Sequence, residues 1–231
     1  MSSRYAMRQW EKTMEYFRYY KTLAEGDIYP LLRDADPLKR HAAAMNMQLR
    51  GFGLSVAKAM CRATDYKTRD LGCFILGQIR TEEKQLPTIM AQLDALAVSD
   101  PTATVRGSAI SAMGHRYALD AAGRFLEVGR ADIWSILANR CRLAAAEPFV
   151  TVRVSVAGAL AHGHHLDDSL LPTLIQLLQD RQGEVRSWAG CAVNGNGYNT
   201  PELHPIFAAM LTDEHEGARD EAERWWEENE E

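Results

Sequence analysis

The stretch that decides the fold is Asp180-Arg-Gln-Gly-Glu-Val-Arg186, in which an acidic residue stands six positions before an arginine. Small or apolar residues follow the arginine at positions +3 and +7, as on the buried side of a helix. The pattern occurs six times, and its acid and arginine pairs are Asp34 with Arg40, Asp65 with Arg69, Asp100 with Arg106, Glu147 with Arg153, Asp180 with Arg186, and Asp213 with Arg219. In the second pair the acid stands four positions before the arginine. Such a recurrence predicts a repeat protein.

The arginines are 29 to 47 residues apart, as expected for repeats that are built from two helices. Amphipathic helical patterns precede most of them, and one such pattern places Leu170, Leu171, Leu174, Ile175, Leu177 and Leu178 on one face. The sequence therefore predicts an all-α fold, a right-handed αα solenoid of about six HEAT-like helix pairs. We expect one domain over residues 1–231, with an N-terminal capping helix at about 4–24, an insertion at about 118–130 and an acidic C-terminal cap at 213–231.

The composition, with 46% hydrophobic and 25% charged residues, is typical of a soluble globular protein. No apolar run approaches the ~20 residues of a membrane span, and charged residues near the N-terminus argue against an export signal. The four cysteines are scattered without metal or redox spacing, which favours a reducing compartment. We therefore expect a cytoplasmic protein that binds no cofactor and no membrane. The net charge of −5 hides an acidic pole, because residues 213–231 hold ten acids and two arginines.

Helical geometry, at ~100° per residue, places positions +2, +5 and +9 after each arginine opposite the buried positions. Second helices line the concave surface of αα solenoids, so these positions are candidates for partner binding. The candidates are Leu71, Phe74, Ser108, Ser111, His115, Ser155, Trp188, Glu221, Arg224 and Glu228. Trp188 could either anchor an interface beside the acids or pack against a neighbouring repeat. The repeat arginines lie on the buried side, so we expect them to form a structural ladder with the acids, within or between repeats.

Two further segments carry side chains that could perform chemistry. His162, His164 and His165 are zinc-ligand types followed by two aspartates, but they fall in a turn where polar residues are expected, so we assign no metal. Aromatic residues of the N-terminal helix alternate with basic ones and could stack bases, but Trp10 and Phe17 are spaced as an ordinary core stripe. No Ser–His–Asp or Cys–His signature is present, so we expect no catalytic residue.

The pattern Asp-x-x-x-x-Val-Arg-x-x-Ala resembles the HEAT-like repeats of the bilin-lyase type. More narrowly, residues 38–51, 184–189 and the stretch Asp65-Tyr-Lys-Thr-Arg-Asp-Leu-Gly-Cys-Phe-Ile-Leu-Gly-Gln-Ile79 resemble the YibA-like HEAT-repeat proteins of enterobacteria. The similarity covers residues from about 5 to 215. Such proteins are encoded beside Rhs polymorphic-toxin genes, so the resemblance implies an immunity protein that binds and neutralises a cognate toxin.

Two alternatives stay open at this point. One is an enzyme on the same scaffold, such as a HEAT-like DNA glycosylase, and the other is a bilin-lyase-like role that rests on fold analogy alone. A glycosylase should carry a basic channel, whereas this chain is acidic overall and the outward positions hold Arg224 and no lysine. We therefore expect a non-enzymatic module with a protein partner, a cognate toxin domain, and we do not expect nucleic-acid binding.

Overall fold

A computed structural model gives the structure of the chain and describes residues 3–119, 124, 126, 130–163 and 166–229. Within these residues the chain forms thirteen α-helices and three short 3-10 helices, the latter at Tyr29–Arg33, Glu83–Gln85 and Asp168–Leu170. Helix α1 (Ser3–Tyr20) precedes six helix pairs. The first helices of the pairs are α2 (Glu25–Ile28), α4 (Leu54–Met60), α6 (Leu86–Ser99), α8 (Ala131–Ala144), α10 (Leu171–Leu178) and α12 (His204–Met210). The second helices are α3 (Pro37–Arg50), α5 (Tyr66–Gln78), α7 (Ala103–Ala118), α9 (Val150–Ala161), α11 (Gly183–Gly195) and α13 (Glu216–Asn229).

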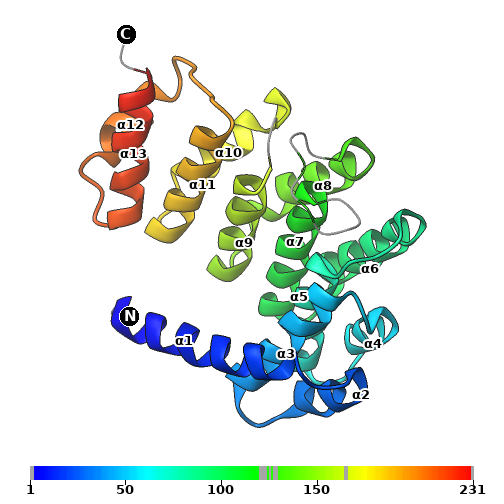
Figure 1. Cartoon of the computed structure of the whole chain (residues 1–231). Helices are drawn as coiled ribbons and strands as arrows, with labels where there is room; N and C mark the ends of the chain where they lie inside the picture. Colours follow the sequence, from blue (N-terminus) through cyan, green and yellow to red (C-terminus); the bar gives the residue numbers. More distant parts are fainter. Residues whose placement is uncertain (1–2, 120–123, 125, 127–129, 164–165, 230–231) are drawn as a thin grey trace.

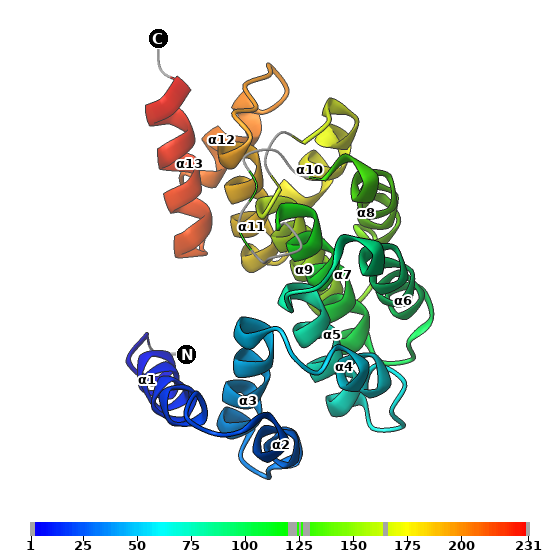
Figure 2. The ribbon, with the colours of Figure 1, turned by 45° about the vertical axis from the view of Figure 1, so that its right-hand side comes forward.

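The six pairs stack in chain order into a curved solenoid (Figures 1 and 2). Each second helix packs against the second helix of the next repeat, from α3 to α13. These helices line the inner side of the curve, and the first helices lie on the outer side. Helix α1 packs against α3 and extends so that its N-terminal end lies across the opening from α13. The predicted all-α solenoid of helix pairs is therefore confirmed.

Apolar side chains between the two layers of helices form the core. Second helices contribute positions +3, +6 and +7, as Ala109 and Met113 of α7 illustrate, because these positions share one side of a helix. In the last repeat the large core residue is Trp225, at +6, which is 1% exposed and stacks on Phe207 with ring centroids 4.7 Å apart. The +7 residue there, Trp226, is half-buried, and no repeat packs over it within the described residues.

The arginine ladder runs between repeats. Nε and Nη2 of Arg153 donate to the two carboxylate oxygens of Asp180 in the next repeat, at 2.5 and 3.0 Å. Nη1 of Arg153 donates at 2.7 Å to the backbone carbonyl of Glu147, six residues earlier. The same ion pairing joins Arg69 to Asp100, Arg106 to Glu147 and Arg186 to Asp213. The carboxylate of each of these acids accepts hydrogen bonds from the arginine of the preceding repeat. The backbone carbonyl of the same acid accepts a hydrogen bond from the arginine of its own repeat.

The aspartates at the ladder position, Asp34, Asp100, Asp180 and Asp213, also shape the turn before the second helix of their own repeats. Oδ1 of Asp213 accepts the backbone N–H of His215 at 2.8 Å, while its carboxylate accepts the guanidinium of Arg186. The hydrogen bond from Arg186 holds the pKa of Asp213 below its ordinary value. Asp34 makes the same turn with the N–H of Asp36 at 2.9 Å, although it receives no ladder arginine. A short carboxylate at this position therefore serves both the turn and the neighbouring repeat.

The second repeat departs from the predicted ladder, and Asp65 is not one of its acids. Its carboxylate accepts the backbone N–H and the hydroxyl of Thr68, both at 2.9 Å, and so caps α5. The residue six positions before Arg69 is Ala63, whose carbonyl accepts Nη1 of Arg69 at 2.9 Å. Because an alanine stands where the other repeats have an acid, Arg40 of the first repeat has no carboxylate partner within the described residues.

We expect the Arg153→Ala substitution to lower the free energy of unfolding by roughly 2–4 kcal/mol. The reason is that the side chain of Asp180, only 10% exposed, would lose the cation that compensates its burial. Arg219→Ala is the matched control, because Arg219 bonds the carbonyl of Asp213 and has no carboxylate partner in the described part of the chain. Urea unfolding of both variants measures the difference, and equal losses would contradict an inter-repeat role for the pair.

The middle second helices approach each other closely at position +8, where the residue is glycine. A Cβ on Gly77 would lie 2.9 Å from Cα of Ala112, and one on Gly114 would lie 2.7 Å from Cα of Ala159. Both distances are shorter than carbon atoms tolerate, so α5, α7 and α9 can pack this closely only without a side chain there. In the first repeat the same position is Gln48, whose side chain bridges α3 and α5.

Gly114→Ala should therefore destabilise the protein by roughly 1–3 kcal/mol, because the new Cβ would separate α7 from α9. This loss runs against the gain of about 1 kcal/mol that alanine brings to a helix interior. Gly195→Ala, at the end of α11, is the control, since nothing lies within 4 Å of a Cβ there. Thermal unfolding should show a lower Tm for Gly114→Ala alone. A Tm raised in both variants would refute the close approach.

The remaining domain predictions are only partly covered by the described residues. The N-terminal capping helix corresponds to α1, which ends at Tyr20. Much of the insertion predicted at 118–130 lies outside the described residues, although the N–H groups of Leu126 and Arg130 bond carbonyls of α7. Helix α13 forms most of the acidic cap. Among the described helices, none combines the length and apolar character that a membrane crossing requires.

Candidate binding surface

The inner surface of the solenoid carries the +2, +5 and +9 positions of the second helices. Leu71, Phe74, Ser108, Ser111, His115, Ser155 and Glu221 are half-buried there, and Trp188, Arg224 and Glu228 are exposed. The hydroxyl of Ser108 already donates to the carboxylate of Asp70 on α5. At the N-terminal end Ala42, which is the +2 residue of α3, is fully buried because α1 packs along α3. The open part of the surface therefore begins at the third turn of α3 and continues to α13.

Three of these residues form an aromatic row across α7, α9 and α11. The ring centroids of His115 and His162 are 4.4 Å apart, and those of His162 and Trp188 are 6.4 Å apart. The ring of Trp188 also lies 4.0 Å from the position that a Cβ on Gly158 would take. Trp188 thus packs against a neighbouring repeat, as one interpretation predicted, while 38% of its surface stays exposed. Its role as an interface anchor stays a prediction. No described contact joins Trp188 to the acids of α13.

The imidazoles of the aromatic row are uncharged near neutral pH. Burial, reinforced by the neighbouring His162, lowers the pKa of His115 to about 4. Burial also lowers the pKa of His162. A neutral imidazole carries one hydrogen-bond donor and one acceptor besides its ring faces. The row therefore offers stacking area and hydrogen bonds without a charge of its own.

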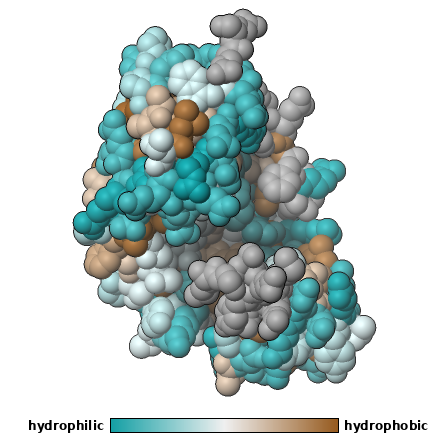
Figure 3. Space-filling view, turned by 90° about the vertical axis from the view of Figure 1, so that its left-hand side faces the viewer, coloured by the Kyte–Doolittle hydropathy of each residue, from teal (hydrophilic) through white to brown (hydrophobic). Residues whose placement is uncertain are grey.

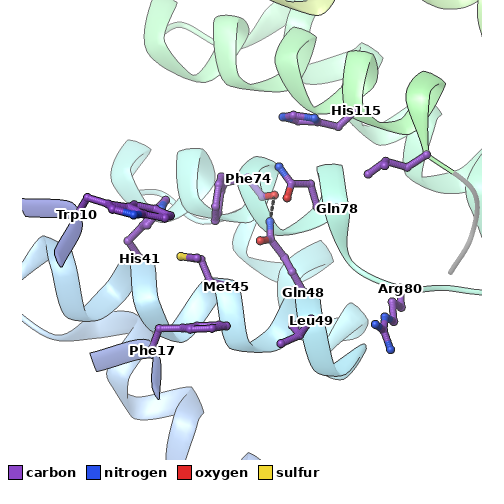
Figure 4. Close-up of a pocket in the computed structure, with 11 residues that line it drawn as sticks. Trp10, Phe17, His41, Met45, Gln48, Leu49, Phe74, Gln78, Arg80 and His115 are labelled. Atoms are coloured by element: carbon purple, nitrogen blue, oxygen red, sulfur yellow. Dashed lines mark hydrogen bonds between the residues drawn. The ribbon is translucent and has the colours of Figure 1, made fainter. Parts of the chain in front are cut away.

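A cavity of about 450 Å³ lies at the N-terminal end of the row, between α1 and helices α3, α5 and α7 (Figure 4). We call it the N-terminal cavity, and its lining includes Trp10, Phe17, His41, Met45, Phe74 and His115. His115 belongs to the cavity and to the aromatic row. The sequence predicted Phe74 and His115 as surface residues but placed Trp10 in the core, whereas its side chain is 54% exposed. The sequence places Trp10 and Phe17 on one face of a helix, and this shared face is the signal that could have located the cavity. In the structure both residues line the cavity between α1 and α3.

The C-terminal end of the surface is charged, and part of that charge is structural. Nδ2 of Asn194 donates to the carboxylate of Glu221 at 2.8 Å and to its backbone carbonyl at 2.9 Å, which joins α11 to α13. Arg224 and Glu228 form an exposed ion pair at 2.9 Å. The face of the molecule that includes α13 is mostly hydrophilic (Figure 3). Of the predicted acids, Glu228 is therefore open to a partner, and Glu221 is held by its own scaffold.

The candidate zinc ligands do not form a site within the described residues. His162 stacks in the aromatic row, and His164 and His165 lie outside the described residues. Asp167 accepts the backbone N–H of Ser169 at 2.7 Å as a cap. The described residues contain no group of three or more histidine, cysteine or acidic side chains placed to hold a metal ion.

Comparison with known proteins shows to which family this chain belongs. The protein YibA of Escherichia coli K12 is 32% identical over 238 aligned positions, which span 96% of this chain and 76% of that protein. The chain belongs to the YibA family. YibA of E. coli O157:H7 matches to the same extent. A crystal structure of E. coli YibA superposes with a TM-score of 0.76 at 30% identity and covers 96% of this chain and 73% of that one. No family model matches the sequence.

The YibA-family fold is shared with designed helical-repeat proteins. A designed armadillo repeat protein in complex with a (KR)4 peptide superposes with a TM-score of 0.55 at 14% identity, over 87% of this chain and 98% of that one. A likeness of this size concerns the fold alone. Stacked helix pairs of this kind present an extended concave surface, and that geometry is suited to protein binding.

Proposed function

We propose that this YibA-family protein is a non-enzymatic module that binds a protein partner along its inner surface. The observation that carries the proposal is the aromatic row of His115, His162 and Trp188. Interface anchors are typically large aromatic side chains that a partner can fully desolvate, and the exposed part of Trp188, 38% of its surface, is available for such a contact. Neutral imidazoles beside it can also be desolvated without the cost of burying a charge.

We further propose that the partner is a cognate Rhs-type toxin and that binding neutralises it. The resemblance to YibA-like proteins encoded beside toxin genes supports this, as does the family membership. The acidic end of the surface suits a basic partner, because opposite charges steer association. The (KR)4 peptide bound by the designed armadillo protein shows that this fold can hold a basic chain. Neither the uncharged aromatic row nor the carboxylates of α13 attract phosphate groups, which argues against a nucleic acid.

Truncation of Trp188 tests the location of the binding surface. We expect Trp188→Ala to weaken binding of the proposed cognate toxin domain by at least about tenfold, because a desolvated aromatic anchor is lost. The variant should keep its helical circular dichroism, since Trp188 is only partly buried. Isothermal titration calorimetry measures the affinity. Normal binding by a folded Trp188→Ala protein would place the surface elsewhere.

The contribution of charge is tested on α13 with a matched pair of variants. Glu228→Lys should slow association severalfold at low salt, and the effect should disappear near 0.5 M salt, where the Debye length is about 4 Å. Glu223→Lys carries the same charge change on the opposite side of α13 and should slow association less. Glu221 is unsuitable for this test because its carboxylate holds Asn194. Stopped-flow association rates for both variants decide between local steering and net charge.

A further inference from the structure

A half-buried carboxylate on the inner surface has no cation beside it. Asp70 of α5 stands at position +1 of the second repeat and lies next to Ser108 of α7. The hydroxyl of Ser108 donates to Oδ1 of Asp70, and Oδ2 accepts no hydrogen bond within the described residues and stays open to solvent. No lysine or arginine of the described residues pairs with this carboxylate. Asp70 is therefore a charged acceptor whose second oxygen is free.

The surroundings of Asp70 disfavour its charge. Burial raises the pKa of the Asp70 carboxyl, although the hydrogen bond from Ser108 opposes the effect. The ladder acids differ in this respect. Burial also acts to raise the pKa of Asp180, but the hydrogen bonds from Arg153 and Gln182 outweigh it, and that pKa is lowered. A carboxylate that is partly removed from water without a cation destabilises the fold, so Asp70 is not explained by stability.

The packing of the repeats does not require a carboxylate at this position. At the next junction α7 and α9 pack with Gly107 at position +1, where a Cβ would lie 2.7 Å from Oγ of Ser155. No charge is involved in that contact. The +1 residues of the other second helices vary in size and charge and are His41, Gly107, Val154, Ser187 and Asp220. Because the scaffold tolerates this variety, the carboxylate of Asp70 points to a role in binding.

Aromatic side chains stand one helical turn before and one turn after Asp70. Tyr66 is 43% exposed, and Phe74, one of the predicted partner-binding residues, is half-buried. Residues four positions apart are neighbours on the surface of a helix. A guanidinium can pair with a carboxylate and lie against an aromatic ring at the same time, whereas an ammonium is a compact and strongly hydrated charge. This face of α5 therefore suits arginine better than lysine.

We propose that Asp70 binds an arginine side chain of the protein partner, whose guanidinium pairs with the carboxylate and lies against the rings of Tyr66 and Phe74. The inference rests on the proposed function, because the arginine belongs to the partner that binds the inner surface. A partner bound there removes this half-buried pair from water, so the pair acts mainly on dissociation. The exposed carboxylate of Glu228 acts mainly on association.

The first test is the Asp70→Asn substitution, which keeps the size of the side chain and an acceptor for Ser108. In the free protein the urea midpoint at pH 7 should equal or exceed that of the wild type, because a charge without a counter-ion is removed. Dissociation of the proposed toxin domain, followed by stopped flow, should become at least about tenfold faster, with association changed less than about twofold. Either a lower urea midpoint or an unchanged dissociation rate would overturn the proposal.

Asp220→Asn is the matched control. Asp220 stands at the same +1 position of α13 and undergoes the same change of charge, but its side chain is exposed. Its dissociation rate should stay within about twofold of the wild type, since an exposed charge contributes little once the complex has formed. Equal effects of the two substitutions would reduce the role of Asp70 to net charge and would overturn the proposal.

A second test uses two basic peptides as probes and does not depend on the toxin. The peptide (KR)4 and octalysine carry the same side-chain charge, and calorimetry at 0.15 M salt measures their affinities. The wild-type protein should bind (KR)4 at least about threefold more tightly than octalysine, and Asp70→Asn should abolish this preference. Equal affinities for the wild type, or a preference that survives in Asp70→Asn, would contradict the assignment of arginine.

The outcomes separate this inference from the proposed function. If Trp188→Ala weakens toxin binding while Asp70→Asn leaves it normal, the inference fails and the proposed function stands. If the wild-type protein binds no toxin, the proposed toxin partner is wrong, and the peptides alone decide whether Asp70 recognises arginine.

Discussion

The guanidinium of each repeat arginine is the interaction on which the rest of the structure depends. In the four complete units it bonds a backbone carbonyl of its own turn and the carboxylate of the next repeat, as Arg153 does with Glu147 and Asp180. One side chain thus fixes the turn between two helices and the offset between two repeats. Because the planar guanidinium has donors in fixed directions, it can satisfy both acceptors at once. The spacing of six residues between acid and arginine follows from these two sets of hydrogen bonds, because the arginine must reach the backbone carbonyl of the acid in its own repeat.

A fixed offset between repeats has a direct consequence for the inner surface. When successive second helices start at the same height, their +2, +5 and +9 positions form one continuous strip. The glycines at Gly77 and Gly114 bring the middle helices close, and His115 and His162 then stack across the junction. The strip changes in character along its length, from an apolar cavity beside α1, through neutral rings, to carboxylates on α13. A partner that binds along it would meet these three chemistries in order.

The sequence predicts the repeats and the ladder well, because both depend on periodic residues that each repeat supplies to its neighbour. Prediction from the sequence is less accurate where a repeat has no equivalent neighbour. Asp65 was assigned to the ladder but caps α5, since the ladder position is Ala63. Trp10 was assigned to the core but stands at the rim of a cavity, because α1 lies outside the repeat pattern.

The sequence signal for the cavity was limited to the shared helix face of Trp10 and Phe17, which does not identify the helices that complete its walls. The hydrogen bond from Nε2 of Gln48 to the carbonyl of Phe74 joins two helices and is visible only in the structure. The choice between pairing within and between repeats was likewise open, because a single chain position offers both a carboxylate and a carbonyl. Contacts of this kind depend on distances between helices, and periodicity alone does not specify them.

The central claim is that the inner surface, and not the outer one, meets the partner. Hydroxyl-radical footprinting of the free protein and of its complex with the toxin domain tests it directly, because oxidation reports the exposure of individual side chains. The account predicts that oxidation of Trp10 and Trp188 falls strongly in the complex. Exposed residues of the outer helix α8, Ile136 and Leu143, should be oxidised as in the free protein. Protection of Ile136 and Leu143 with unchanged oxidation of Trp188 would contradict the account.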